Sequence, residues 1–193
     1  MTEIKELKVE DIKKSAGEKA CPVGAALYYV TEFLAGPMCG RCFPCAMGSY
    51  EARLRLQSII DGKGSEADVT ALKRIAAEMA EASMCKKGKD TAAFITAWIN
   101  EGVFTAHVEG ICPSGECLTF MEYRIIAGKC SACGLCKDAC KHNAIIGEKS
   151  KPYRNDFPFE IRQRRCAKCG ECLTVCPEEA IIVTGKRQAG AGV

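Results

Sequence analysis

Apolar residues recur every three or four positions across the first half of the chain, which is the spacing of an amphipathic helix. This pattern predicts four helices: one that begins at Pro22, one that begins at Pro44, one that follows the capping-box residue Ser65 and stops near Gly88, and one that Asp90 opens. Short amphipathic helices with brief connections favour a small bundle. We therefore expect a four-helix bundle in this half.

The second half contains an internal repeat. The run CSACGLCKDACKHNAII, from Cys130, aligns with CAKCGECLTVCPEEAII, from Cys166, with all four cysteines, one glycine and the Ala-Ile-Ile tail in register. Each copy predicts a loop with three cysteines, a helical turn with the fourth and a short β-like tail. The polar insertion between the copies predicts a surface loop and a short strand. Helices followed by short strands indicate the α+β class.

Cysteine is the residue type that most changes this picture. The chain has 15 cysteines among 193 residues, an odd number clustered at two-residue gaps. Thiolates so spaced converge on one metal centre. A secreted disulfide scaffold is the competing interpretation, but the start MTEIKELKVEDIKK is charged and has no apolar core of the kind a signal peptide needs. We therefore expect reduced thiols and a cytoplasmic location.

The strongest chemical signal is a doubled C-x2-C-x2-C-x3-C run in the second half. Three cysteines at this spacing wrap a loop around one face of a [4Fe–4S] cluster. A pair of zinc sites is the alternative, although such sites usually arise from paired C-x2-C units. The first run comprises Cys130, Cys133, Cys136 and Cys140, and the second comprises Cys166, Cys169, Cys172 and Cys176.

These runs resemble those of the bacterial two-cluster ferredoxins, in which the fourth cysteine of each run serves the other cluster. The resemblance implies crossed ligand sets. One cluster would take Cys130, Cys133, Cys136 and Cys176, and the other Cys166, Cys169, Cys172 and Cys140. Lys141 stands where the family has proline, and a cation there is expected to raise the potential of the nearby cluster.

A third quartet lies in the helical half. Three cysteines follow one another at an even three-residue step in GPMCGRCFPCAMG, and a fourth lies 40 residues further on. The segment resembles E-S-C-G-x-C-x-P-C-R-x-G of the NADH-oxidising flavoprotein subunit of complex I, where a distant cysteine completes a [4Fe–4S] site in a four-helix domain. The resemblance implies a cluster on Cys39, Cys42, Cys45 and Cys85.

A fourth constellation combines the remaining cysteines with a histidine. The segment AHVEGICPSGEC resembles the H…C-P-x-G-x-C stretch that follows the helical domain in flavoprotein subunits of NAD-linked electron-bifurcating hydrogenases, which also carry a C-terminal ferredoxin pair. A Cys3His set suits a structural zinc ion, here expected to tie the bundle to the ferredoxin unit. A [2Fe–2S] site and plain buried thiols are the alternatives. The expected zinc ligands are Cys21, His107, Cys112 and Cys117.

The expected cofactors also change the charge balance. The formal charge of +3 counts every cysteine as neutral, whereas a cluster with four thiolates carries about −2, so three clusters bring the net charge to roughly −3. The weak basicity is therefore no argument for a nucleic-acid partner. No apolar run reaches the length that crosses a bilayer, so no membrane span is expected.

The expected architecture is a small four-helix bundle holding one [4Fe–4S] cluster, followed by a bacterial 2[4Fe–4S] ferredoxin-like domain. The resemblance covers almost the whole chain from about Cys21. The predicted segments are an N-terminal extension at 1–20, the helical domain at 21–102, a linker with the zinc site at 103–128, the ferredoxin-like domain at 129–184 and a tail at 185–193.

No catalytic site is evident in the sequence. The G-x-G of Gly62-Lys63-Gly64 lies in a predicted turn, without the strand–loop–helix setting of a dinucleotide cradle, so we expect this chain to bind neither flavin nor NAD. We predict an electron-transfer subunit of a multi-subunit NAD(P)- or ferredoxin-linked oxidoreductase, which includes the electron-bifurcating kind. The expected partners are a flavin/NAD-binding subunit, a catalytic subunit of hydrogenase, formate or aldehyde oxidoreductase type, and soluble ferredoxin. The alternatives are a freestanding polyferredoxin-like carrier and a zinc-dependent interaction module.

Overall fold

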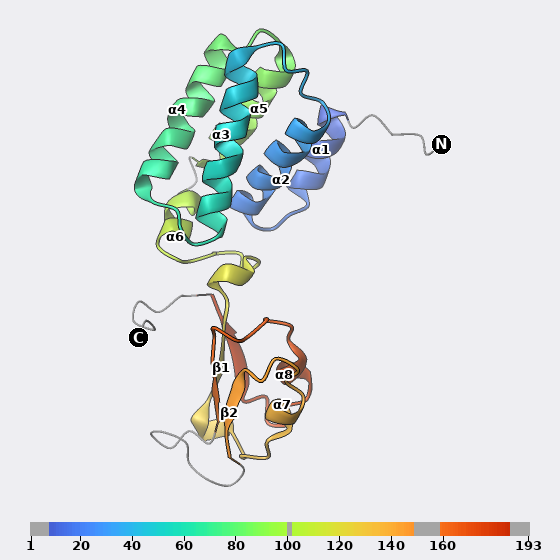
Figure 1. Ribbon diagram of the computed structural model, residues 1–193, viewed down its shortest axis with the longest axis vertical. Helices are drawn as coiled ribbons and strands as arrows, with labels where there is room; N and C mark the ends of the chain where they lie inside the picture. Colours follow the sequence, from blue (N-terminus) through green and yellow to red (C-terminus); the bar gives the residue numbers. More distant parts are fainter. Residues whose placement is uncertain (1–7, 100–101, 149–158, 186–193) are drawn as a thin grey trace, which may run out of the picture. The chain divides into compact units, whose positions relative to one another are not determined.

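The computed structural model describes residues 8–99, 102–148 and 159–185, and the chain divides into two compact units, Met1–Phe120 and Met121–Val193. The first unit is helical and the second contains short strands and helical turns (Figure 1). The predicted α+β class, a helical bundle followed by a ferredoxin-like unit, is confirmed. No helix in the described part of the chain combines the length and the apolar character that crossing a membrane requires.

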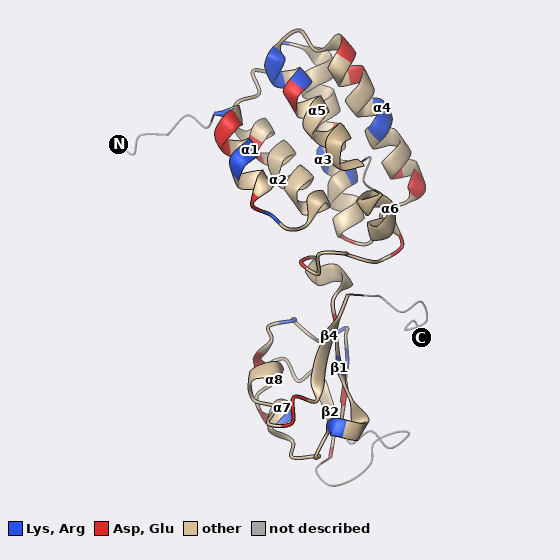
Figure 2. Cartoon of the chain, turned by 180° about the vertical axis from the view of Figure 1, so that it is seen from behind, with Lys and Arg blue, Asp and Glu red and all other residues tan. Residues whose placement is uncertain are grey.

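The first unit consists of helices packed around one apolar core. The core includes the large buried side chains of Tyr29, Phe33, Leu56, Leu72 and Ile95. Figure 2 shows that α2 is nearly free of charge, and its sequence holds a single charged residue. The helices are α1 (Val9–Gly17), α2 (Pro22–Ala35), α3 (Phe43–Ile60), α4 (Glu66–Ala82), α5 (Lys86–Ile99) and α6 (Val103–Val108), followed by a 3-10 turn at Leu118–Phe120.

Two helix boundaries differ from the sequence prediction. Helix α1 forms inside the segment expected to be an extension, because Val9, Ile12 and Ala16 present one apolar face that is buried in the core. Helix α5 begins at Lys86, four residues before the predicted start, so Gly88 lies inside a helix and does not end one. Glycine fits at position 88 because the Cβ atom of any other residue would lie 2.7 Å from the Ser83 hydroxyl oxygen, too close for a normal contact.

The second unit is built from two interlocked antiparallel strand pairs. Strand β1 (Glu122–Ile125) pairs with β4 (Ile181–Thr184), and β2 (Ile145–Gly147) pairs with β3 (Phe159–Ile161). Thus the strand before each cysteine run pairs with the strand after the other run. The helical turns α7 (Leu135–Asp138) and α8 (Glu171–Thr174) each carry part of a run.

The sequence repeat is also a repeat of backbone conformation. Gly134 and Gly170 have φ of 80° and 81°, and Ala132 and Lys168 both have φ of 58°. These positions are equivalent in the two copies. The left-handed conformation is costly for residues other than glycine, so its recurrence at matching positions indicates that both loops wrap around an object of the same shape.

Candidate metal centres

The motif cysteines of the second unit form two groups, and each group lines a separate cavity. Each group takes three cysteines from one run and the fourth cysteine from the other run. The first cavity is lined by Cys130, Cys133, Cys136 and Cys176, and the second by Cys140, Cys166, Cys169 and Cys172. The groups have the same membership as the crossed sets expected from the sequence.

Strand pairing and backbone hydrogen bonds produce this crossing. The strand that follows each cysteine run pairs with the strand that precedes the other run. This pairing places the fourth cysteine of each run beside the loop of the other run. The Ala144 N–H donates to the Cys140 Sγ at 3.4 Å, and the equivalent Ala180 N–H donates to the Cys176 Sγ at 3.3 Å. Hydrogen bonds to cluster sulfurs stabilise the added charge of a reduced cluster and raise its potential.

One thiol in each cavity is harder to ionise than a free cysteine. Burial raises the pKa of Cys136 to about 11, and the other thiols of the first cavity add to this effect. Burial and the neighbouring thiolates likewise raise the pKa of Cys172 in the second cavity. A bound metal supplies the positive charge that makes four adjacent thiolates favourable. Four convergent sulfurs in an otherwise apolar cavity therefore fit the donor set of an iron–sulfur cluster.

Two further side chains lie beside the second cavity. Tyr123, which sequence reasoning did not assign, lines it, and burial, followed by the thiolates of that cavity, raises the Tyr123 pKa. Lys141, expected to raise the potential of the nearby cluster, donates to Glu171 at 2.7 Å. Lys141 and its partner are exposed, so water and the carboxylate reduce the effect of its charge.

The four cysteines of the helical quartet lie where four helix ends meet. They stand at the end of α2, the start of α3, the end of α4 and the start of α5. Cys42 is the N-cap residue of α3 and Cys45 lies in its first turn, and both are buried, while Cys39 and Cys85 are exposed. A pocket opens beside Cys39 between α1, the α2–α3 loop and α5.

Electrostatics show that these four thiols are close neighbours. Burial raises the pKa of Cys45 to about 11, and the thiolates of the other three cysteines add to the shift. The backbone N–H groups of Met84 and Cys45 hydrogen-bond to Cys42 and lower its pKa. Two helix N-termini stand beside these cysteines and favour negative charge. This combination suits a group that binds thiolates and carries net negative charge.

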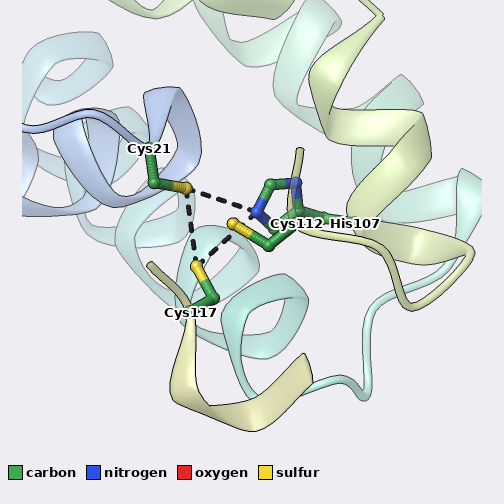
Figure 3. Close-up of side chains that lie close together, drawn as sticks. All are labelled: Cys21, His107, Cys112 and Cys117. Carbon is green, nitrogen blue, oxygen red and sulfur yellow. Dashed lines mark hydrogen bonds between the residues drawn. The ribbon is translucent and has the colours of Figure 1, made fainter. Parts of the chain in front are cut away.

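The fourth constellation brings three thiols and an imidazole together in a buried position (Figure 3). Cys21 is the N-cap residue of α2, His107 lies on α6, and the other two cysteines lie in the following loop. The Cys21 Sγ is 3.4 Å from the Cys117 Sγ and 3.3 Å from the His107 Nε2. The ligand atoms of Cys21, His107, Cys112 and Cys117 all lie within 4.8 Å of one another.

These separations fit one tetrahedral ion. Zinc bonds of about 2.3 Å to sulfur and 2.0 Å to nitrogen place the ligand atoms about 3.5–3.8 Å apart, and the three contacts among Cys21 Sγ, Cys117 Sγ and His107 Nε2 measure 3.3, 3.4 and 3.6 Å. A [2Fe–2S] cluster would separate the ligands into two pairs on two irons, which a group within 4.8 Å does not allow. The geometry therefore favours a single ion over the two-iron alternative.

The pKa shifts of these residues favour a thiolate at Cys21, which is the form that binds a cation. Hydrogen bonding from Cys117, and then from His107, lowers the pKa of Cys21 to about 3, although burial opposes the shift. The same contact raises the pKa of Cys117, which is the donor. Burial acts to lower the His107 pKa, but the hydrogen bond to Cys21 raises it overall.

The surrounding contacts fix the ligand orientations. His107 Nδ1 lies 2.8 Å from the Val103 carbonyl oxygen, and donation there leaves Nε2 free to face the sulfurs, as in most metal-binding histidines. Glu116 accepts from the Cys21 backbone N–H at 2.8 Å, and Ser114 lies 3.3 Å from the Cys112 Sγ. Sequence reasoning missed both. All four candidate ligands belong to the first unit, so an ion here would close that unit internally, contrary to the expected tie between the units.

Comparison with known proteins finds a family model that matches part of each unit. Residues 25–108 match the NADH-ubiquinone oxidoreductase-F iron-sulfur binding region, and residues 129–180 match the 4Fe-4S dicluster domain. The chain is an iron–sulfur protein. A 141-residue stretch is 32% identical to the NADP-reducing hydrogenase subunit HndC of Solidesulfovibrio fructosivorans, covering 70% of this chain and 28% of that protein. The resemblance to the iron–sulfur part of NADH-oxidising flavoprotein subunits is confirmed, and the chain spans just over a quarter of that relative's length.

Proposed function

We propose that this protein is an iron–sulfur electron-transfer subunit of a cytoplasmic NAD(P)- or ferredoxin-linked oxidoreductase complex. It would hold three [4Fe–4S] clusters and one structural zinc ion, and it would pass electrons between redox partners without transforming a substrate. The observation that carries the proposal is the crossed grouping of eight cysteines in two cavities of the second unit. Both family matches and the convergence of four thiols in the first unit add support.

Each proposed cluster has four thiolate ligands from the groups described above. The helical unit would hold the first cluster, and the ferredoxin-like unit would hold the other two. The ligand sets are Cys39, Cys42, Cys45 and Cys85 for the first cluster, Cys130, Cys133, Cys136 and Cys176 for the second, and Cys140, Cys166, Cys169 and Cys172 for the third. The protein's contribution is to place the clusters and to set their potentials through hydrogen bonds, charge and solvent access.

Zinc in the Cys3His constellation would have a structural role. Its four ligands, Cys21, His107, Cys112 and Cys117, are buried and leave no open coordination position, which is the mark of a structural zinc site. The ion would join the start of α2 to α6 and the loop that follows it. It would therefore join the early and the late parts of the helical unit's sequence.

The proposed partners are suggested by the relative described above. The name of the 32% identical relative describes a subunit of an NADP-reducing hydrogenase. We propose a flavin/NAD-binding partner and a catalytic partner of hydrogenase type, with formate or aldehyde oxidoreductases as the other candidates. An electron-bifurcating complex is one form that such an assembly takes. Soluble ferredoxin is the proposed external carrier.

Anaerobic metal analysis tests the cofactor content. We expect about twelve irons, about twelve sulfides and one zinc per chain, because three cubane clusters and one tetrahedral ion account for all four ligand groups. Eight irons would contradict the cluster in the helical unit. A colourless preparation without sulfide would contradict all three clusters and favour a zinc-dependent interaction module.

Co-purification from the native source tests the assignment as a subunit. We expect flavin- and hydrogenase-type chains to remain with this protein through anaerobic size-exclusion chromatography. A monomer that carries all its clusters and exchanges electrons without companions would contradict the subunit assignment and favour a freestanding polyferredoxin-like carrier.

A further inference from the structure

Large apolar side chains are exposed beside the cysteines of the first unit. Met84 is 83% exposed and Phe43 is 77% exposed, the two highest values among the exposed large apolar residues of the described chain. Met84 precedes Cys85 and Phe43 follows Cys42. Met47, one helical turn after Phe43, is 49% exposed. Apolar side chains gathered on a surface in this way mark interaction sites.

Exposed basic side chains lie close in sequence to these apolar residues. The two segments that carry the four cysteines, 36–50 and 82–89, contain four basic residues and no acidic residue. All four are exposed: Arg41, Lys86, Lys87 and Lys89. The acidic residues just outside the second segment are Glu81 and Asp90, and Asp90 lies 3.8 Å from Lys86. Figure 2 shows both signs of charge near the turn from α4 to α5.

The two segments lie side by side in the structure. Lys87 donates to the Pro37 carbonyl oxygen at 3.4 Å, which joins the start of α5 to the α2–α3 loop. The Cys45 Cβ lies close to Gly88, so the start of α3 is next to the same turn of α5. The apolar and basic residues therefore occupy one end of the bundle, around the proposed first cluster.

We propose that this end of the bundle is the docking surface for an acidic electron-carrier protein. The cluster-end face, defined as Phe43, Met47 and Met84 with Arg41, Lys86, Lys87 and Lys89, combines exposed apolar side chains with exposed basic side chains, which are here called its basic rim. A protein that carries acidic side chains around an exposed cofactor is complementary to it in both respects. The inference rests on the proposed function, because docking here brings a carrier next to the first cluster.

Charge argues against the other occupant of such a face, a second copy of this chain. In a two-fold symmetric contact, each residue of the patch meets the same patch on the partner. Two basic rims would then face each other, and like charges in contact oppose association. An acidic partner turns the same rim into an attraction that speeds encounter and weakens with salt.

Binding measurements on the full chain test the docking surface. The probe is an acidic bacterial 2[4Fe–4S] ferredoxin, with basic cytochrome c as the opposite-charge comparison, measured by anaerobic calorimetry at 50 and 200 mM salt. We expect ferredoxin to bind and to lose affinity as salt rises, and cytochrome c to bind at least tenfold more weakly. Lys87→Glu should weaken ferredoxin binding about tenfold and Met84→Gln about fivefold.

Matched substitutions at a distance provide the controls. Lys63 is exposed in the turn after α3, at the opposite end of an 18-residue helix, so it lies about 27 Å from the cluster end. Lys63→Glu makes the same charge change and should alter the affinity less than twofold. Leu54→Gln makes an apolar-to-polar change three turns along α3 and should do likewise.

Several results would overturn this inference. The inference fails if ferredoxin binding is absent or does not depend on salt, or if cytochrome c binds equally well. It also fails if Lys63→Glu weakens binding as much as Lys87→Glu does, or if the wild-type chain is a dimer that Met84→Gln dissociates. Iron and sulfide are measured on the same preparations. A chain with full iron content that does not bind ferredoxin refutes only the docking surface, whereas a chain without iron refutes the proposed function.

Discussion

Replacing Cys21 by serine should remove the long-range link of the proposed zinc site and lower the stability of the helical unit. Cys21 and Cys117 are 96 positions apart in the sequence and their sulfurs are 3.4 Å apart. Cross-linking a loop of this length stabilises the folded state by about 4.5 kcal/mol through the lost freedom of the unfolded chain. The remaining ligands, 107–117, close only a short loop. The substitution is nearly isosteric, so little packing is lost at this 1% exposed position.

Anaerobic thermal unfolding, followed by circular dichroism at 222 nm, measures this effect. The unfolding entropy of a unit of 120 residues is about 0.25 kcal/mol per kelvin, so the loss corresponds to a melting temperature roughly 15–20 °C lower. Ser114→Ala, which removes only a neighbouring hydroxyl, serves as the control and should shift the midpoint by less than 5 °C. A Cys21→Ser protein that melts within 3 °C of the wild type, while zinc analysis gives one ion per wild-type chain, would refute the reasoning.

Three further results are expected. Gly88→Ala should destabilise the helical unit by about 1–3 kcal/mol in urea unfolding, because the new methyl group would meet Ser83 at 2.7 Å, while Gly17→Ala, with open space around it, should not destabilise it. Cys176→Ser should remove the electron paramagnetic resonance signal of the second cluster, because the other three ligands of that cluster come from the first cysteine run. If only the signal of the third cluster were lost, the crossed ligand sets would be wrong. In zinc-free protein, the Cys21 thiol has a pKa of about 3, lowered from 9.0. Its contribution to the free energy of unfolding should therefore be complete above pH 9 and should disappear as the pH falls toward 3. The Cys21→Ser protein should lack this pH dependence.

The cysteine runs made the second unit predictable in unusual detail. Its loops, helical turns and β-like tails follow from a motif in which ligand spacing dictates backbone path, and the repeat gives the same answer twice. The prediction that each helical turn carries the fourth cysteine was wrong: α7 carries Cys136 and α8 carries Cys172, the third cysteines of their runs. The pairing of strands across the repeats was not visible in the sequence itself, because four-residue strands carry too little alternation to specify a partner. The resemblance to ferredoxins implied the crossing of the fourth cysteines, and no strand pairing was predicted from it.

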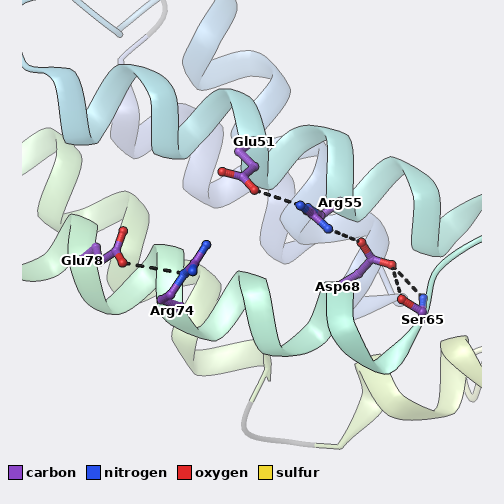
Figure 4. Close-up of polar contacts among 6 residues, drawn as sticks. All are labelled: Glu51, Arg55, Ser65, Asp68, Arg74 and Glu78. Atoms are coloured by element: carbon purple, nitrogen blue, oxygen red, sulfur yellow. Dashed lines mark hydrogen bonds and ion pairs between the residues drawn. The ribbon is translucent and has the colours of Figure 1, made fainter.

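The helical unit shows where periodicity is sufficient and where it is not. The capping box at Ser65 and Asp68 is present as predicted, but the pattern gave no sign that Arg55 of α3 also binds Asp68 at 2.8 Å, as Figure 4 shows. That contact, with the Ser65 groups, holds the Asp68 pKa below its ordinary value although burial opposes it. Gly88 was misread as a helix end because a glycine required by close packing and one required by a turn look identical in a sequence.

Candidate ligands were easier to predict than the groups that orient them. Cys21, His107, Cys112 and Cys117 were assembled from residue type and resemblance, and the structure brings them together. The Glu116 carboxylate, the Ser114 hydroxyl and the Val103 carbonyl reach the ligand residues only because the folded chain places them there. Such contacts leave no signal in residue spacing, so only the folded chain reveals them.

The exchange of strands and cysteines between the repeats means that the ferredoxin-like unit has no separable half. Each cube would be sealed by a residue from the opposite copy, and each sheet needs a strand from both. Oxidative damage at one cube would therefore release an anchor of the other, and the pair would be lost together. A single copy of the repeat would need a second copy from another chain to complete either site, and that pairing would depend on concentration; one chain that holds both copies removes this dependence.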